Sequence, residues 1–192
     1  MNKLVIASSN AGKLIEIQAI LSGVECIAQN TLGIASIEET GLTFVENAIL
    51  KARHASKISN QPALADDSGL VVPALQGMPG IYSARFAGMH ATDRENSNLL
   101  LKNLKNIPPA ERTAIFYCVL ALVQHATDPV PVIVTGKLSG LITQEHHGAN
   151  GFGYDPVFYL TEYACTLAQL SAQIKNTISH RAQALHLLAK DL

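Results

Sequence analysis

Charge of either sign is scarce in this sequence. Charged residues make up 15% of the 192 residues, against roughly 25% in an average soluble domain. The 14 basic and 15 acidic residues nearly cancel, which leaves a formal net charge of −1. The chain therefore has no global field that would recruit nucleic acid or an anionic membrane, and any phosphate binding must come from a local site.

Cysteines and long apolar runs are also scarce. Cys26, Cys118 and Cys165 lie far apart and form no Cys-x-x-Cys pair, so we expect neither a disulfide framework nor a structural zinc site. The longest apolar run covers residues 114–123, about half the roughly 20 residues that a membrane-spanning helix needs. The N-terminal residues lack the apolar core of a secretory signal. We therefore expect a soluble cytoplasmic protein with no membrane or nucleic-acid partner.

The distribution of apolar residues predicts an α/β fold. They make up 48% of the chain, which is ample for a core. A buried strand is expected at residues 4–7, followed by a polar turn and then a helix with Leu14, Ile17 and Leu21 on one face. An interior sheet strand is expected at 114–123 and a returning antiparallel strand at 130–138. With no repeat or linker, we expect one domain over residues 1–192.

Two further helices are predicted from their first turns. Thr43 with Glu46, and Thr92 with Glu95, have the spacing of a capping box. In this motif the threonine hydroxyl accepts the backbone amide of the glutamate, and the glutamate carboxylate accepts that of the threonine. We expect the first of these helices to bury one face and expose the other; the buried positions are Phe44, Ala48, Ala52 and Ala55, and the exposed ones Lys51, Arg53 and Lys57. A last helix is predicted from the apolar spacing of Ala182, Leu185 and Leu188.

Two adjacent carboxylates, Asp66 and Asp67, are the first candidate for chemistry. We expect residues 66–69 to form a turn between short strands at 63–65 and 70–72. Paired carboxylates repel unless a cation is present, and hard oxygen ligands suit Mg²⁺. The Glu38-Glu39 pair could complete such a site. The alternative is a solvated turn, because Asp, Ser and Gly all favour turns.

The turn at residues 8–13 is the second candidate. Gly12 lets the backbone approach a phosphate, and Lys13 supplies a compact positive charge at a helix N-terminus. The segment is not a Walker A loop, because Ala7 stands at the first glycine position and Leu14 follows the lysine. The alternative is an ordinary helix start with a solvated lysine.

Two further candidates lie towards the C-terminus. In residues 151–156, Phe152 and Tyr154 could present flat faces on which a base stacks, or their rings could pack into the core. Lys175 and residues 179–181 could supply cationic and hydrogen-bonding groups to a base or phosphate, or form a solvated helix start. Each of these readings stays open from the residues alone.

The combination of these segments resembles the inosine/xanthosine triphosphate pyrophosphatase family, over nearly the whole chain. Six motifs carry the resemblance in order. They are Ser9-Asn10-Ala11-Gly12-Lys13, the stretch 39–48 (Glu-Thr-Gly-Leu-Thr-Phe-x-Glu-Asn-Ala), Ala65-Asp66-Asp67-Ser68-Gly69-Leu70, Pro79-Gly80-Ile81-Tyr82-Ser83-Ala84-Arg85, Gly151-Phe152-Gly153-Tyr154-Asp155-Pro156 and Ser179-His180-Arg181.

The resemblance implies an elongated, two-lobed α/β fold with a long mixed sheet flanked by helices, an active cleft between the lobes, and a homodimer. It also implies Mg²⁺-dependent, house-cleaning hydrolysis of non-canonical purine nucleoside triphosphates (ITP, dITP, XTP) to the monophosphate and pyrophosphate. Asp67 would be the proton acceptor, and Asp67 with Glu38 would hold the metal. The implied substrate contacts are Ser8, Ser9, Asn10, Ala11, Gly12, Lys13, Lys51, Ser68, Phe152, Gly153, Tyr154, Asp155, Lys175, His180 and Arg181.

One position departs from the family pattern, in which the first turn is commonly Thr-Gly-Asn. Ser9 stands at the usual glycine here, and a positive φ at this residue would add strain of roughly 1–2 kcal/mol. Three other readings stay open: a related pyrophosphatase for pyrimidine or modified nucleotides, a nucleotide sensor that does not hydrolyse, and a purely structural module.

Overall fold

The computed structural model describes residues 3–190. Its seven strands form one mixed sheet in the order β2-β1-β3-β4-β5-β6-β7. β1 pairs in parallel with β2 and β3, whereas β6 pairs antiparallel with β5 and β7. The strands are β1 (Lys3–Ile6), β2 (Glu25–Ala28), β3 (Ala63–Val71), β4 (Thr113–Val123), β5 (Val132–Ile142), β6 (Phe158–Leu160) and β7 (Cys165–Thr166). The prediction of an α/β fold with a mixed sheet is confirmed.

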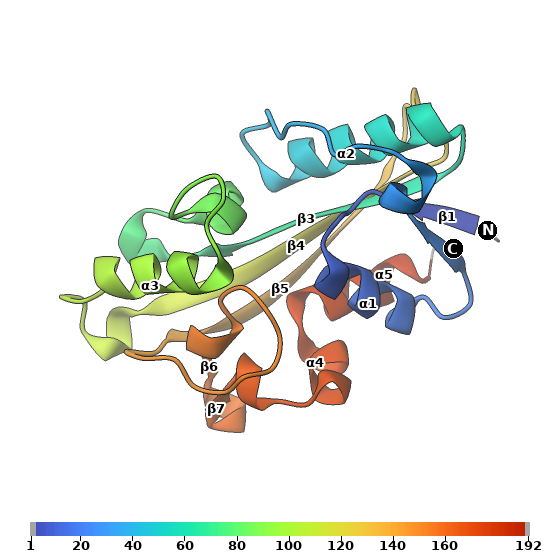
Figure 1. Ribbon diagram of the computed structural model, residues 1–192. Helices are drawn as coiled ribbons and strands as arrows, with labels where there is room; N and C mark the ends of the chain where they lie inside the picture. Colours follow the sequence, from blue (N-terminus) through green and yellow to red (C-terminus); the bar gives the residue numbers. More distant parts are fainter. Residues whose placement is uncertain (1–2, 191–192) are drawn as a thin grey trace. The chain divides into compact units, whose positions relative to one another are not determined.

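The α-helices are labelled in Figure 1; they are α1 (Ala11–Ile20), α2 (Phe44–Ser59), α3 (Asp93–Asn103), α4 (Ala172–Ile178) and α5 (His180–Leu188). Both predicted N-terminal caps are present: Thr43 accepts the amide of Glu46, and Thr92 forms a full capping box with Glu95. The predicted strands at 4–7, 114–123 and 130–138 correspond to β1, β4 and β5, and β4 and β5 are neighbours in the sheet. No helix among residues 3–190 is long and apolar enough to span a membrane.

The described chain divides into two compact units, and β3, β4 and β5 contribute residues to both. The first unit contains 3–67, 118–136 and 180–190, and the second contains 68–117 and 137–179. The core of the second unit is formed mainly by residues of the segment 154–170, with further residues from β3, α3, β4 and β5. Its aromatic members are Phe116, Tyr154 and Phe158.

The first unit has a separate apolar layer on each face of its strands, as the period-two alternation of a strand requires. Leu4 and Ile6 of β1 and Leu64 of β3 pack with α1 and α5 on one face. Val5 of β1 and Ala63 and Ala65 of β3 pack against α2 on the other. This alternation decides where the polar residues that continue β3 must lie.

Gly136 of β5 lets α5 approach the sheet of the first unit closely. A Cβ at this position would lie inside van der Waals contact of the His180 carbonyl and would crowd the amide of Ala184. Only glycine lacks that atom. The position of α5, and therefore of the side chains at its first turn, depends on this approach.

Candidate active site

The predicted turn at residues 8–13 opens helix α1. The Asn10 side chain accepts the amide of Lys13 at 3.0 Å, while the Ser8 hydroxyl accepts the amide of Asn10 at 3.2 Å. No acidic residue stands in the first turn of α1, so no carboxylate of that turn offsets the partial positive charge of the helix N-terminus. Ser9 is not among the described non-glycine residues with positive φ, so the strain that a positive φ would have caused at this position is absent.

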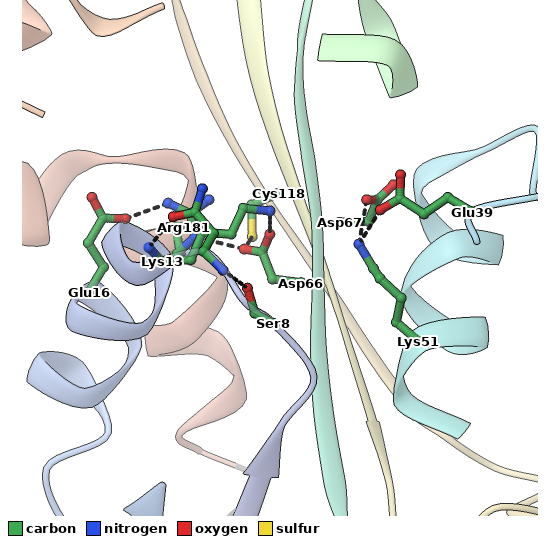
Figure 2. A network of polar contacts seen from close by, with 10 residues as sticks. Ser8, Lys13, Glu16, Glu39, Lys51, Asp66, Asp67, Cys118 and Arg181 are labelled. Atoms are coloured by element: carbon green, nitrogen blue, oxygen red, sulfur yellow. Dashed lines mark hydrogen bonds and ion pairs between the residues drawn. The ribbon is translucent and has the colours of Figure 1, made fainter. Parts of the chain in front are cut away.

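The prediction of an acidic turn at 66–69 is wrong. These residues belong to the unbroken strand β3, whose neighbours in the sheet are β1 and β4. The ladder hydrogen bonds of a central strand satisfy the backbone, and this outweighs the local turn preference of Asp, Ser and Gly. As a consequence, Asp66 and Asp67 point to opposite faces of the sheet (Figure 2). Asp66 continues the Leu64 face towards α1 and α5, and Asp67 continues the Ala65 face towards α2.

Asp66 is buried and bonded through both of its carboxylate oxygens. Oδ1 accepts the ammonium of Lys13 from α1, and Oδ2 accepts Nε of Arg181 from α5 at 2.7 Å. The thiol of Cys118 also lies 3.2 Å from Oδ2. Burial acts to raise the pKa of Asp66, but Arg181 and Lys13 outweigh it and hold that pKa well below its usual range. Asp66 is therefore a permanent anion at neutral pH.

Asp67 lies in a different electrostatic environment. Its Oδ1 accepts the Lys51 ammonium of α2 at 2.7 Å, and the same ammonium donates to Glu39 at 2.9 Å. Burial raises the pKa of Asp67 to about 6, against the opposing effect of Lys51. The second oxygen, Oδ2, is buried and has no hydrogen-bond partner among the described residues. A carboxylate with a pKa near neutrality and an unused oxygen has the properties of a general base.

The two members of the acidic pair 38–39 differ in position. Glu38, the predicted metal ligand, is exposed. Glu39 is half-buried on Lys51, and its charge acts to raise the pKa of Asp67. Lys51 itself was expected on the exposed face of its helix, yet its side chain is 15% exposed because it pairs with these two carboxylates. Within residues 3–190, no group of three or more His, Cys, Asp or Glu side chains is arranged to hold a metal.

The glycine-containing loop of the second unit is tied together by Asp155. Its carboxylate accepts the amide of Phe152 at 3.0 Å and the ammonium of Lys175 at 2.6 Å. That ammonium also lies 4.5 Å from the centroid of the Phe152 ring. Gly151 has a positive φ, and a Cβ there would collide with the Asp155 carboxylate. The carboxylate of Asp93, at the start of α3, accepts the amide of Gly153 at 2.7 Å.

Of the two readings that the sequence left open for Tyr154, the structure shows the second, in which the ring packs into the core. The residue is 4% exposed and belongs to the apolar core of the second unit. The hydroxyl donates to the Ser83 carbonyl at 2.8 Å, so the polar end of the buried ring is satisfied. Phe152 is half-buried and is the aromatic residue of this loop that retains an accessible surface.

The remaining predicted residues lie near the junctions of elements. Ser68 is half-buried in β3, and His180 and Arg181 begin α5 as buried residues of the first unit. The alternative of a solvated helix start is therefore wrong for residues 180 and 181. The Arg181 guanidinium, expected at the base and sugar, is bonded to Asp66 and to Glu16 of α1.

The sequence reasoning missed the roles of Glu16, Glu39, Asp66 and Asp93. A signal existed for Glu16, because it lies three residues after Lys13 on α1 and so falls near the same helix face. The alternation of strand side chains would have separated Asp66 from Asp67 had the segment been read as a strand. The contacts of Glu39 and Asp93 connect residues far apart in sequence, and no local pattern indicates them.

Comparison with known proteins finds relatives that match nearly the whole chain. A model of the Ham1 family matches residues 4–191. A dITP/XTP pyrophosphatase of Legionella pneumophila (strain Lens) is 57% identical over 188 residues, with 98% of this chain and 97% of the relative covered. That of Escherichia coli (strain K12) is 52% identical over 190 residues, with 98% and 96% covered.

Solved structures agree with this grouping. A HAM1 protein from Coxiella burnetii superposes with a TM-score of 0.92 at 48% identity, with 100% of this chain and 98% of that chain covered. The Ham1 protein of Staphylococcus aureus gives a TM-score of 0.87 at 43% identity, with 99% and 97% covered.

Proposed function

Because the chain belongs to the Ham1 family, we propose that it hydrolyses dITP, ITP and XTP to the monophosphate and pyrophosphate. The relatives named dITP/XTP pyrophosphatase support the substrate class. The observation that carries the proposal is the difference between the two aspartates of β3. Asp66 is ion-paired with Lys13 and Arg181, whereas Asp67 has a buried oxygen without a hydrogen-bond partner among the described residues and a pKa of about 6. Neighbouring carboxylates whose pKa values are driven apart are typical of acid–base sites.

The turn at residues 8–13 receives the phosphates in this proposal. The first turn of α1 carries no acidic residue, and the Lys13 ammonium of that turn is bonded to Asp66. Backbone N–H groups and a fixed cation stabilise charge on phosphate oxygens, which is the largest electrostatic requirement of phosphate chemistry. Lys51, next to Asp67, is the second cation assigned to the phosphate chain.

Asp67 takes the proton from the attacking water. Its pKa of about 6 leaves it ionised at neutral pH yet basic enough to accept a proton. Such general-base catalysis contributes typically about 10²–10⁴-fold in rate. Lys51 holds Oδ1 in place, and Oδ2 is the oxygen left to contact water.

The residues around Asp67 fit Mg²⁺. Oδ2 of Asp67, a buried carboxylate oxygen without a hydrogen-bond partner among the described residues, is a suitable metal ligand. An acidic residue of the pair 38–39 would be the second protein ligand. Mg²⁺ is commonly held by one or two carboxylates together with substrate phosphates. When bound, the ion would supply positive charge to the phosphate oxygens.

We assign the loop of the second unit to the base and sugar, through Phe152, Gly153, Asp155 and Lys175. Phe152 is fixed by Asp155 and Lys175, so its ring is pre-ordered for stacking. Donors aimed at the 6-oxo group of the purine would be left unpaired opposite the amino group of adenine, which rejects ATP.

The test is a panel of nucleoside triphosphates with pyrophosphate release as the readout, with and without Mg²⁺. We expect turnover of dITP, ITP and XTP well above that of ATP, dTTP and UTP. Asp67→Asn, confirmed as folded by circular dichroism, should lose at least about 100-fold in kcat. Preference for UTP or dTTP would favour the related pyrimidine or modified-nucleotide enzymes, and tight ITP binding without pyrophosphate release would favour a sensor.

The metal assignment has its own matched pair of variants. Glu38 is the residue that the resemblance assigns, and Glu39 is the one bonded to Lys51. Glu38→Gln and Glu39→Gln remove the same charge from adjacent positions, so the variant with the larger rise in the Mg²⁺ concentration for half-maximal rate identifies the ligand. Homodimer formation and a cytoplasmic location are part of the same proposal. Analytical ultracentrifugation of the wild-type protein measures its oligomeric state in solution.

A further inference from the structure

The buried cluster around Asp66 is balanced in charge and built from four elements. Lys13 and Glu16 come from α1, Arg181 from α5 and Asp66 from β3, while Cys118 of β4 adds a thiol (Figure 2). Arg181 is 2% exposed and Asp66 is 2% exposed. Charges this deeply buried persist only when they are paired and hydrogen-bonded.

Lys13 is the most exposed charged side chain of the cluster. It is 16% exposed, against 11% for Glu16 and 2% for Arg181. Asp66 Oδ1 is the hydrogen-bond partner recorded for its ammonium among the described residues. An ammonium has three N–H donors, so the contact with Asp66 leaves two of them for a ligand.

Asp66 cannot share the role of its neighbour, because it lies on the other face of β3. Asp67 faces α2 and Lys51, whereas both oxygens of Asp66 are engaged by residues from α1, α5 and β4. The Arg181 guanidinium bridges Asp66 to Glu16 and so fixes the carboxylate from behind. Arg181 thereby sets the orientation of Asp66, and Asp66 in turn orients the Lys13 ammonium.

We propose that Asp66 is a positioning residue that holds the Lys13 ammonium at the N-terminus of α1 for the triphosphate, with Arg181 and Glu16 as its buried support. The inference rests on the proposed function in one respect, that Lys13 receives phosphate. It assigns to the first aspartate of the pair a task separate from proton transfer and from metal binding. A flexible lysine that is held in one orientation loses less freedom when it binds an anion.

The test measures binding of inorganic tripolyphosphate by titration calorimetry in EDTA, in a double-mutant cycle of Asp66→Asn and Lys13→Met. Charge-assisted contacts of this kind support an expected weakening of roughly tenfold for either single variant. In the Lys13→Met background, Asp66→Asn should change the dissociation constant by less than about twofold, because the ammonium that Asp66 positions is absent. A purely structural role would weaken binding equally in both backgrounds and would overturn the proposal.

Glu16→Gln is the matched control, because it removes one carboxylate from the same guanidinium and leaves the Asp66–Lys13 contact in place. We expect it to lower the melting temperature as Asp66→Asn does, but to weaken tripolyphosphate binding less. Equal weakening by both variants would contradict the proposal. If Asp66→Asn does not fold, Asp66→Glu keeps the charge, displaces it by one methylene, and enters the same cycle. Failure of wild type to hydrolyse any nucleotide would refute the proposed function and leave this binding cycle decisive.

Discussion

Replacing Asp67 by Asn should make the metal-free protein more stable, although it removes the proposed base. At neutral pH the folded protein must ionise a carboxyl whose pKa has risen from 3.8 to about 6. Each pKa unit corresponds to 1.36 kcal/mol, so the ionised side chain disfavours the folded state by about 3 kcal/mol. Asn has nearly the shape of the protonated acid and carries no charge. For a chain of this length, the gain would raise the melting temperature by roughly 6–12 °C.

The size of this effect depends on pH. The raised pKa means that the folded state holds its proton up to higher pH than the unfolded state does. Below pH 3.8 both states are protonated, and wild type and variant should be equally stable. The difference should grow as pH rises from about 4 to 6 and then stay constant.

The assay is thermal unfolding of both proteins at several pH values between 4 and 8, in EDTA. Asp128→Asn is a suitable control, because the amides of Gln124 and Val130 lower the pKa of Asp128 and its replacement should destabilise the protein. Added Mg²⁺ should raise the melting temperature of wild type but not of Asp67→Asn. An Asp67→Asn protein that is less stable at pH 7.5, or a difference that does not vary with pH, would refute the reasoning.

Three further predictions follow from single contacts. The kcat/KM of wild type should fall as pH drops below about 6, where Asp67 takes up its proton. More Mg²⁺ should move the midpoint of this fall to lower pH, because a nearby cation favours the ionised carboxylate. A midpoint that does not change with the Mg²⁺ concentration would count against metal binding at Asp67. Gly136→Ala should cost about 1–3 kcal/mol of unfolding free energy in a denaturant titration, because the new Cβ meets the His180 carbonyl, whereas Gly23→Ala, with open space around it, should cost less. Ser9→Gly should keep kcat/KM within about threefold, because Ser9 has no positive φ to relieve; a larger fall would assign a role to its hydroxyl, which lies 3.5 Å from that of Ser36.

Much of the fold could be predicted because its signals are local. The strand over 4–7, the helix that follows the polar turn, and the caps at Thr43 and Thr92 all depend on residues within one or two turns of one another. The acidic segment was misread because Asp, Ser and Gly carry a turn preference that is weak beside the pairing of a central strand. Which segments pair is decided by contacts that are distant in sequence.

The candidate site could be predicted as a set of residue types but not as a set of pairs. The turn at 8–13 and the acidic pair were two separate candidates, and the contact of Lys13 with Asp66 brings them together. That Arg181 is buried against Asp66, and that Glu39 rather than Glu38 lies on Lys51, depends on how α5 and α2 pack. The burial of Tyr154 was one of two alternatives, and the tertiary contact with Ser83 decides between them.

The alternation of side chains along β3 makes the spacing of its residues as important as their identity. Deleting one residue between the β1-paired start of the strand at Ala63 and the aspartates would exchange the faces of everything beyond the deletion. The carboxyl of Asp67 would then face α1 and α5, and the half-buried Ser68 would take its place opposite Lys51. Such a protein would keep both carboxyl groups but would exchange the faces of the sheet on which they lie. Insertions and deletions should therefore be tolerated in the loops around this strand long before they are tolerated within it.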